Sequence, residues 1–218
     1  AARLFGEDHR PFLGLLSQLA LARRDDRLSN VVLVIRPLEI GWGKAGELRD
    51  AIGRLRAAGR HTTAYLDLAS FSASREYYVA SAADEIYVVP GGNVPVIGLA
   101  AEYFFLGGLW QKLGVGFEVA KAGRYKSAVE SYAGTGMSEA SKEMANSLLD
   151  STHDAFVEAI AQGRGLSLEA VRAAIDAGPM LPKELLAQAL IDGVEHLDIL
   201  LDRIGGEVVR AETWARVG

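Results

Sequence analysis

The sequence predicts an α/β fold, with a parallel sheet in its first part and helices in its C-terminal region. Short apolar runs rich in β-branched residues alternate with segments of helical periodicity over residues 1–120, and this alternation is typical of parallel β-α units. Helical patterns dominate afterwards. No linker rich in serine or proline and no internal repeat divides the 218 residues, of which 50% are hydrophobic. We therefore predict a single domain over residues 1–218, with a full core.

Three strands are expected in the first half of the chain. The run Val31–Ile35 is continuous and β-branched, which is typical of a strand buried on both faces. Residues 62–66 form the next strand, and residues 86–89 form a third that ends at the turn sequence Pro90-Gly91-Gly92. Apolar positions at helical spacing predict helices over residues 11–28, 45–58 and 77–83, the second of them closed by Gly59.

The second half of the chain is predicted to be mainly helical. A helix is expected over residues 103–113, followed by a short strand over Gly116–Ala120. A long helix begins near Ser138 and ends near Gln162, with an apolar stripe along one side. Two shorter helices follow, over residues 168–177 with Ser167 as N-cap and over residues 183–190 after Pro182.

Composition and charge exclude several classes of function. The net charge of −5 argues against nucleic acid as a partner, since phosphate binding favours a basic face. Cysteine is absent and the four histidines lack metal-ligand spacing, so we expect no thiolate catalysis and no metal site. No apolar run approaches the roughly 20 residues that span a bilayer, and charged residues interrupt the N-terminal stretch, which does not resemble a signal peptide. A membrane anchor would lie outside this segment.

The most informative stretch is residues 120–130 (AKAGRYKSAVE), because it places a lysine in a glycine-bearing loop just after an expected strand. A lysine held at a strand end can be desolvated, and burial favours the neutral form of an amine. As a neutral amine, Lys126 can take the proton of a serine hydroxyl, as in Ser-Lys catalytic sites. The alternative is a solvated surface lysine.

Four segments, taken in this order, carry a resemblance: residues 77–87 (YYVASAADEIY), 112–115 (KLGV), 124–130 (RYKSAVE) and 137–139 (MSE), the last of which opens the long helix. Together they are similar to the signal peptide peptidase A family of Ser-Lys peptidases. The match runs from about Val31 to Leu197. This resemblance implies the fold of the Clp protease and crotonase superfamily, with a parallel sheet and a C-terminal helical arm that meets neighbouring subunits.

The same resemblance implies the site residues. Lys126 falls on the position of the family's general base. Ser74 falls on the nucleophile position, in a run that reads Ala-Ser-Gly-Gly-Tyr-Tyr in members with both groups in one domain. Here Arg75 and Glu76 replace both glycines, and the loop of residues 36–44 (RPLEIGWGK) is not the glycine-rich loop that supplies oxyanion-hole amides. With these departures the chain resembles the N-terminal half of family members that contain two repeats in tandem. In those members the first repeat keeps the lysine and the second repeat supplies the serine.

The leading prediction is the lysine-donating half of a membrane-associated serine endopeptidase in an extracytoplasmic (periplasmic) space. By resemblance it degrades signal-peptide remnants and other apolar peptides without a cofactor. The isolated chain is then expected to be inactive and to form homo-oligomers. Three alternatives stay open: a self-contained Ser74/Lys126 peptidase, a non-catalytic repeat that binds peptide or assembles, and an acyl-CoA enzyme of the crotonase type.

Three further features each allow two interpretations, one functional and one purely structural. Tyr125 and Ser127 flank the lysine, and either orient it or bond locally. Residues 90–98 either line a groove for an extended peptide or form an ordinary loop. The apolar cluster of residues 103–110 favours subunit packing or a hydrophobic substrate channel over plain core.

Overall fold

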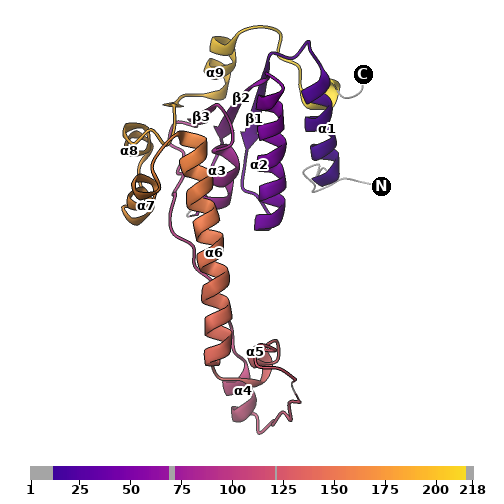
Figure 1. Cartoon of the computed structure of the whole chain (residues 1–218), viewed down its shortest axis with the longest axis vertical. Helices are drawn as coiled ribbons and strands as arrows, with labels where there is room; N and C mark the ends of the chain where they lie inside the picture. Colours follow the sequence, from indigo (N-terminus) through magenta and orange to yellow (C-terminus); the bar gives the residue numbers. More distant parts are fainter. Residues whose placement is uncertain (1–11, 69–71, 121, 215–218) are drawn as a thin grey trace. The chain divides into compact units, whose positions relative to one another are not determined.

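Figure 1 shows the computed structural model of the chain, which describes residues 12–68, 72–120 and 122–214. Its contacts form two compact units. The larger unit consists of Ala1–Ile97 and Val157–Gly218, and the smaller unit of Gly98–Phe156. The long helix α6 (Glu139–Arg164) contributes residues to both units. The prediction of a single domain stays a prediction.

The larger unit is built around a parallel sheet, as the alternation of strands and helices predicts. In the described part of the chain the sheet has four strands in the order β1-β2-β3-β4, and each strand pairs in parallel with its neighbour. Figure 1 labels the first three of them. The strands are β1 (Asn30–Ile35), β2 (His61–Leu66), β3 (Glu85–Val88) and β4 (Gly193–Val194). The first three agree with the predicted strands, which confirms the α/β fold. The short β4 was not predicted, because two residues are too few to show a period.

Helices connect and cover the strands of the larger unit. Besides the end of α6, they are α1 (Phe12–Arg24), α2 (Trp42–Ala57), α3 (Ser74–Ala80), α7 (Leu168–Asp176), α8 (Pro182–Ala187), α9 (Leu197–Ile204) and α10 (Ala211–Trp214). α3 begins before the predicted residue 77, so that Ser74 is its first residue. Ser167 caps α7 as predicted, since its side chain accepts the N–H of Ala170 at 3.1 Å.

β1 departs from the prediction in its burial. Its continuous β-branched run indicates a strand covered on both faces, yet only Ile35 among its six residues, all of them described, is buried. Val34 is 42% exposed. The reason is topological: β1 lies at the end of the strand order and pairs on one side only, so the described residues cover it incompletely.

The core of the larger unit lies around β2. Ala64 and Leu66 of this strand are fully buried. The intervening side chain, Tyr65, points to the opposite face of the sheet, where it packs with Tyr87 of β3 and Leu200 of α9. The sheet therefore carries buried side chains on both faces at β2, unlike at β1.

Polar contacts attach the C-terminal region to α3 and β3. The hydroxyl of Tyr77 donates to the carbonyl O of Leu190 at 2.5 Å, and burial raises the pKa of this tyrosine. Arg164 at the end of α6 donates to both carboxylate oxygens of Asp192 at 2.9 Å. Asp192 in turn accepts the N–H of Ile86 at 2.8 Å. These bonds position the chain for β4 beside β3.

The end of α6 crosses the end of α3 at backbone contact distance. A Cβ atom at Gly163 would lie 1.8 Å from the carbonyl O of Ser81, so only glycine fits there. Arg49 of α2 donates to three groups around this crossing: the carbonyl O of Tyr78 at 2.9 Å, Oγ of Ser81 at 2.6 Å and the carbonyl O of Ala159 at 2.6 Å. Burial lowers the pKa of this guanidinium.

The smaller unit contains α4 (Gly107–Lys112), α5 (Glu130–Ala133) and the first turns of α6. α4 begins later than the predicted residue 103. The predicted strand over Gly116–Ala120 is wrong, because residues 115–120 form neither helix nor strand and are all exposed. No strand among the described residues pairs with this run, and its apolar side chains make other contacts. Phe117 packs edge-on against Trp110, with 5.6 Å between the ring centroids.

α4 and α5 approach each other backbone to backbone. The N–H of Leu106 donates to the carbonyl O of Ser131 at 2.9 Å, and the N–H of Gly107 donates to the carbonyl O of Gly134 at 3.0 Å. A Cβ atom at Gly107 would lie 2.5 Å from that same oxygen. Glycine is therefore required at the first position of α4 for this contact.

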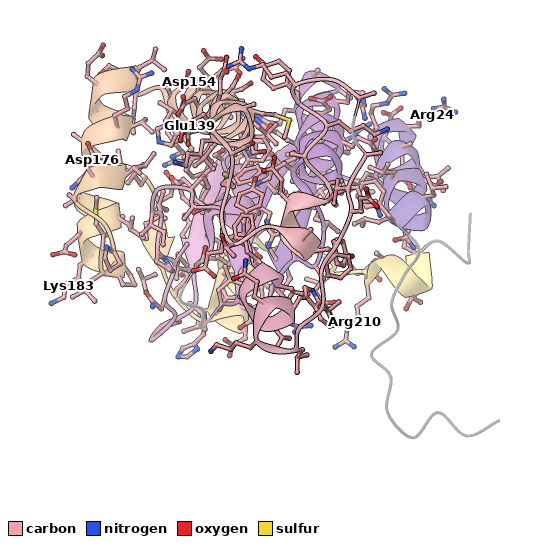
Figure 2. All side chains as sticks on the ribbon, turned by 90° about the horizontal axis from the view of Figure 1, so that it is seen from below. Arg24, Glu139, Asp154, Asp176, Lys183 and Arg210 are labelled. Atoms are coloured by element: carbon pink, nitrogen blue, oxygen red, sulfur yellow. The ribbon has the colours of Figure 1, made fainter. Side chains whose placement is uncertain are left out.

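Charged side chains of the larger unit lie at its surface. Arg24, Asp176 and Lys183 point outward into solvent (Figure 2). In the charge run after α1, Arg27 donates to Asp25 at 2.7 Å, and hydrogen bonds from this arginine and from Trp214 hold the pKa of Asp25 well below its usual range. Within the described residues, no helix is both long enough and apolar enough to cross a bilayer.

Candidate functional site

Lys126 lies in the smaller unit, directly after a turn. Gly123 opens the turn with a φ of +94°, and its carbonyl O accepts the N–H of Lys126 at 3.4 Å. Since the expected strand before it does not form, the lysine is not held at a strand end, and its side chain is exposed rather than desolvated. Its amine makes no hydrogen bond or ion pair within the part of the chain that the structure describes. The other lysine of residues 120–130, Lys121, lies outside the described residues.

The residues before Lys126 tie the turn to α6. Arg124 donates to Oε2 of Glu143 at 2.8 Å, and the hydroxyl of Tyr125 donates to Oε1 of the same carboxylate at 3.3 Å. The Arg124 guanidinium also lies 5.1 Å from the centre of the Tyr125 ring. Tyr125 thus bonds locally, which is one of the two predicted alternatives.

The residues after Lys126 are tied to α6 by a carboxylate. Glu130 begins α5 and accepts the N–H of Ser138 at 3.1 Å, the hydroxyl of Ser138 at 2.8 Å and the hydroxyl of Ser141 at 2.6 Å. Ser138 precedes α6, and its Oγ accepts the N–H of Ser141 at 3.3 Å, as an N-cap residue does. Sequence reasoning missed Glu130, although its place at the end of the lysine motif was a signal.

Ser74 belongs to the larger unit, where it begins α3. It is only 4% exposed, and its hydroxyl donates to the carbonyl O of Ile97 at 3.0 Å. A catalytic serine needs a hydroxyl that can reach both a base and the substrate carbonyl. In this chain the hydroxyl is bonded to a backbone acceptor instead.

The two residues that replace the expected glycines bind the loop after β1. Glu76 is 6% exposed, and its Oε1 accepts the N–H of Leu38 at 2.7 Å. Arg75 donates to the carbonyl O of Ile40 at 2.5 Å. An oxyanion hole needs backbone N–H groups that are open to the substrate. Here the Leu38 amide already has a carboxyl partner from within the chain.

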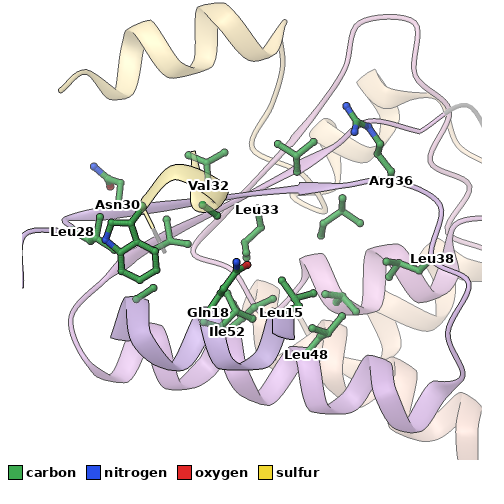
Figure 3. Close-up of a pocket in the computed structure, with 18 of the residues that line it drawn as sticks. Leu15, Gln18, Leu28, Asn30, Val32, Leu33, Arg36, Leu38, Leu48 and Ile52 are labelled. Atoms are coloured by element: carbon green, nitrogen blue, oxygen red, sulfur yellow. The ribbon is translucent and has the colours of Figure 1, made fainter. Parts of the chain in front are cut away.

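A cavity of about 590 Å³ lies beside β1 in the larger unit (Figure 3). Its lining is mainly aliphatic and comes largely from α1, β1 and α2, with Leu15, Leu33 and Ile52 as examples. Neither Ser74 nor Lys126 is among the lining residues that the structure describes. Among the described residues, no group of histidine, aspartate and glutamate side chains is placed to hold a metal ion.

The loop after β3 packs into the larger unit. Val94 and Val96 are buried, and the N–H of Asn93 donates to the carbonyl O of Leu68 at 3.0 Å. Buried side chains of this kind favour the ordinary loop over the substrate groove as the interpretation of residues 90–98.

Large apolar side chains are exposed on the smaller unit. Phe104 is 79% exposed and Leu113 is 61% exposed. Further exposed apolar residues in this unit are Tyr103, Leu106, Leu109, Val115, Phe117, Val119, Tyr125, Tyr132, Met144 and Leu148. Exposed apolar side chains in such number within one unit favour an interaction site. The interpretation of residues 103–110 as plain core is therefore wrong for most of them.

The model of peptidase family S49 matches residues 55–207, which is more than two thirds of the chain. The chain belongs to peptidase family S49. The matched span includes both Ser74 and Lys126. The resemblance to the signal peptide peptidase A family, predicted from four short segments, is confirmed.

Curated relatives in this family are longer proteins. Serine protease SPPA, chloroplastic, of Arabidopsis thaliana is 30% identical over 190 residues, covering 85% of this chain and 28% of the relative. Protease 4 of Haemophilus influenzae is 31% identical over 121 residues, covering 56% and 19%. Putative signal peptide peptidase SppA of Enterococcus faecium is 22% identical over 206 residues, covering 94% and 59%. The chain spans less than two thirds of the length of each.

The fold has a counterpart among solved structures. A mutant form of the membrane-bound stomatin-specific protease 1510-N aligns with a TM-score of 0.56 and 14% identity, covering 90% of this chain and 78% of that protein. At this identity the likeness shows the fold alone, and it confirms the predicted fold class. The family and the names of the relatives support the predicted class of serine peptidase.

Proposed function

We propose that this chain is the lysine-donating half of a serine endopeptidase of the signal peptide peptidase type. In this proposal a second repeat, outside this chain, supplies the nucleophilic serine and the oxyanion-hole amides. The observation that carries it is a contrast between two positions. Lys126 is exposed and has no partner among the described residues, whereas Ser74 is buried and its hydroxyl is bonded to a backbone carbonyl.

The proposed reaction assigns one role to Lys126. When the two repeats assemble, the second repeat covers the exposed Lys126 amine. This burial favours the neutral form of the amine. The neutral amine takes the proton of the incoming serine, whose oxygen attacks the carbonyl carbon of the peptide while backbone amides hold the oxyanion. The lysine then returns the proton to the leaving amine. No cofactor takes part.

The self-contained alternative needs Ser74 as the nucleophile. Its hydroxyl would have to leave the carbonyl O of Ile97, and the Leu38 amide would have to leave Glu76 to bind an oxyanion. Each change breaks a hydrogen bond of a largely buried side chain, which costs about 1–3 kcal/mol for a group left unpaired. The contacts therefore favour a serine from a second repeat.

By resemblance, the proposed substrates are signal-peptide remnants and other apolar peptides. The proposed location is the membrane, with this chain in an extracytoplasmic (periplasmic) space and the anchor outside this chain. The exposed apolar side chains of the smaller unit support contact with apolar partners of this kind.

Ser74 should resist serine-directed phosphonates in the isolated 218-residue chain. We expect no adduct on Ser74 by peptide mass spectrometry and no hydrolysis of apolar peptides, because the hydroxyl is buried and held by Ile97. The full-length gene product, treated in the same way, should carry the label on a serine outside residues 1–218. An adduct on Ser74 would overturn the two-repeat proposal and favour the self-contained dyad.

The isolated chain should self-associate through the exposed apolar side chains of its smaller unit. We expect sedimentation velocity to show assemblies whose share rises with concentration, because burial of exposed apolar side chains favours association. Phe104→Asp should shift the distribution toward monomer. Leu13→Asp, at a residue of α1 that is 74% exposed, is the matched control and should leave it unchanged. A strict monomer at high concentration, in both the isolated chain and the full-length product, would contradict this prediction.

A further inference from the structure

We propose that Glu130 is a positioning residue, which sets where the Lys126 amine stands by fixing the lysine segment to the start of α6. This inference rests on the proposed role of Lys126 as the base. The Lys126 amine has no partner among the described residues, so within them its position follows from the backbone of its segment. Whatever fixes the segment of residues 124–133 therefore decides where the amine is presented.

The Glu130 carboxylate has the contacts that a positioning role requires. It begins α5, four residues after Lys126, and both of its oxygens are used by donors at the start of α6. Ser141, one of the donors, is 5% exposed. Hydrogen bonds to an ionised acceptor are roughly twice as strong as neutral ones, and a carboxylate is favoured beside the N-terminus of a helix.

The other connections between this segment and α6 are weaker, and the hydroxyl of Tyr125 reaches the Glu143 carboxylate only at 3.3 Å. Arg124 and Glu143 form an ion pair at 2.8 Å, but their side chains are 66% and 57% exposed. Exposed pairs contribute little to stability because water screens them. Glu130 accepts three hydrogen bonds from the start of α6 in a partly buried setting, and is therefore the dominant connection among the described residues.

α5 passes this restraint on to its neighbours. The carbonyl O of Glu130 accepts the N–H of Gly134 at 2.8 Å, and α4 bonds to Ser131 and Gly134 at the other side of α5. The N–H of Glu130 donates to the carbonyl O of Ser127, next to the lysine, at 2.8 Å. Loss of the carboxylate would remove the three hydrogen bonds that join the first residue of α5 to the start of α6.

The first test measures activity in the full-length gene product. We expect Glu130→Ala to lower kcat on the order of 10²-fold with KM unchanged, because a base displaced by about 1 Å loses its geometry while substrate binding is untouched. Glu130→Gln should retain more activity, since its amide oxygen still accepts one hydroxyl. Glu139→Ala is the matched control: this carboxylate begins α6 but is 88% exposed and pairs only with Lys142 within the described residues, so kcat should be unchanged.

The second test measures amide hydrogen exchange in the 218-residue chain, independently of activity. Glu130→Ala should speed exchange over residues 124–133 on the order of tenfold, while exchange in β2 stays unchanged. Uniformly faster exchange would mean a general structural role and would overturn the inference. So would an unchanged kcat in Glu130→Ala when Lys126→Ala is inactive. If Lys126→Ala is itself fully active, the proposed function falls, whatever the exchange experiment shows about Glu130.

Discussion

Lys126→Ala should abolish peptide hydrolysis by the full-length gene product. We expect kcat to fall by a factor on the order of 10²–10⁴, which is what a general base contributes. The fold should be unaffected, because the side chain is exposed and makes no hydrogen bond or ion pair among the described residues. Hydrolysis of an apolar fluorogenic peptide measures the loss, and thermal unfolding of the same preparation checks the fold.

Lys126→Arg should be nearly as damaging, since a guanidinium stays protonated and cannot accept the serine proton. Lys112→Ala is the matched control, because this exposed lysine lies in the same unit at the end of α4. It should keep most of the activity. Turnover by Lys126→Ala at a rate near that of the unmodified protein would remove the peptidase assignment of this site and favour a non-catalytic repeat.

Gly163→Ala should destabilise the chain by about 1–3 kcal/mol or more, the usual cost of overpacking. The added Cβ would lie 1.8 Å from the carbonyl O of Ser81, and a backbone atom cannot rotate away as the end of a side chain can. Helix propensity acts in the opposite direction, because alanine is favoured over glycine by about 1 kcal/mol in a helix interior. We expect the steric cost to exceed the gain in helix propensity. Urea denaturation followed by circular dichroism measures the difference in free energy of unfolding between the variant and the unmodified chain.

Gly53→Ala is the matched control, because it changes helix propensity without a steric clash. Gly53 also lies inside a helix, α2, but nothing lies within 4 Å of a Cβ built there. This variant should be neutral or more stable by up to about 1 kcal/mol. Equal stability of the two variants would show that α6 can move away from α3 without cost, and would contradict the role assigned to the Gly163 crossing.

The sequence predicted most regular elements because their signals are local. The β-branched run of β1 and the apolar periodicity of α6 each reflect the repeat of one element. The strand expected over Gly116–Ala120 failed for the same reason: apolar alternation shows that a segment can pair, but not whether a partner strand lies beside it. The incomplete burial of β1 also depended on its place in the strand order.

The candidate site was likewise predicted only in part from the sequence. The motif around Lys126 and the replacement of two glycines by Arg75 and Glu76 are visible in the sequence, and they pointed to the family that the comparisons confirm. The contacts of those residues are not visible there. That Glu76 binds the Leu38 amide and that Glu130 binds Ser138 became clear only from the tertiary structure.

The sequence by itself thus determined the α/β class, the family and the position of the lysine, because these depend on residue types at short spacings. Only the tertiary structure decided that Ser74 is buried against Ile97, that Lys126 is exposed, and that Gly163 lies against Ser81. Burial and hydrogen-bond partners depend on which distant segments pack together. A one-dimensional pattern carries no record of that packing.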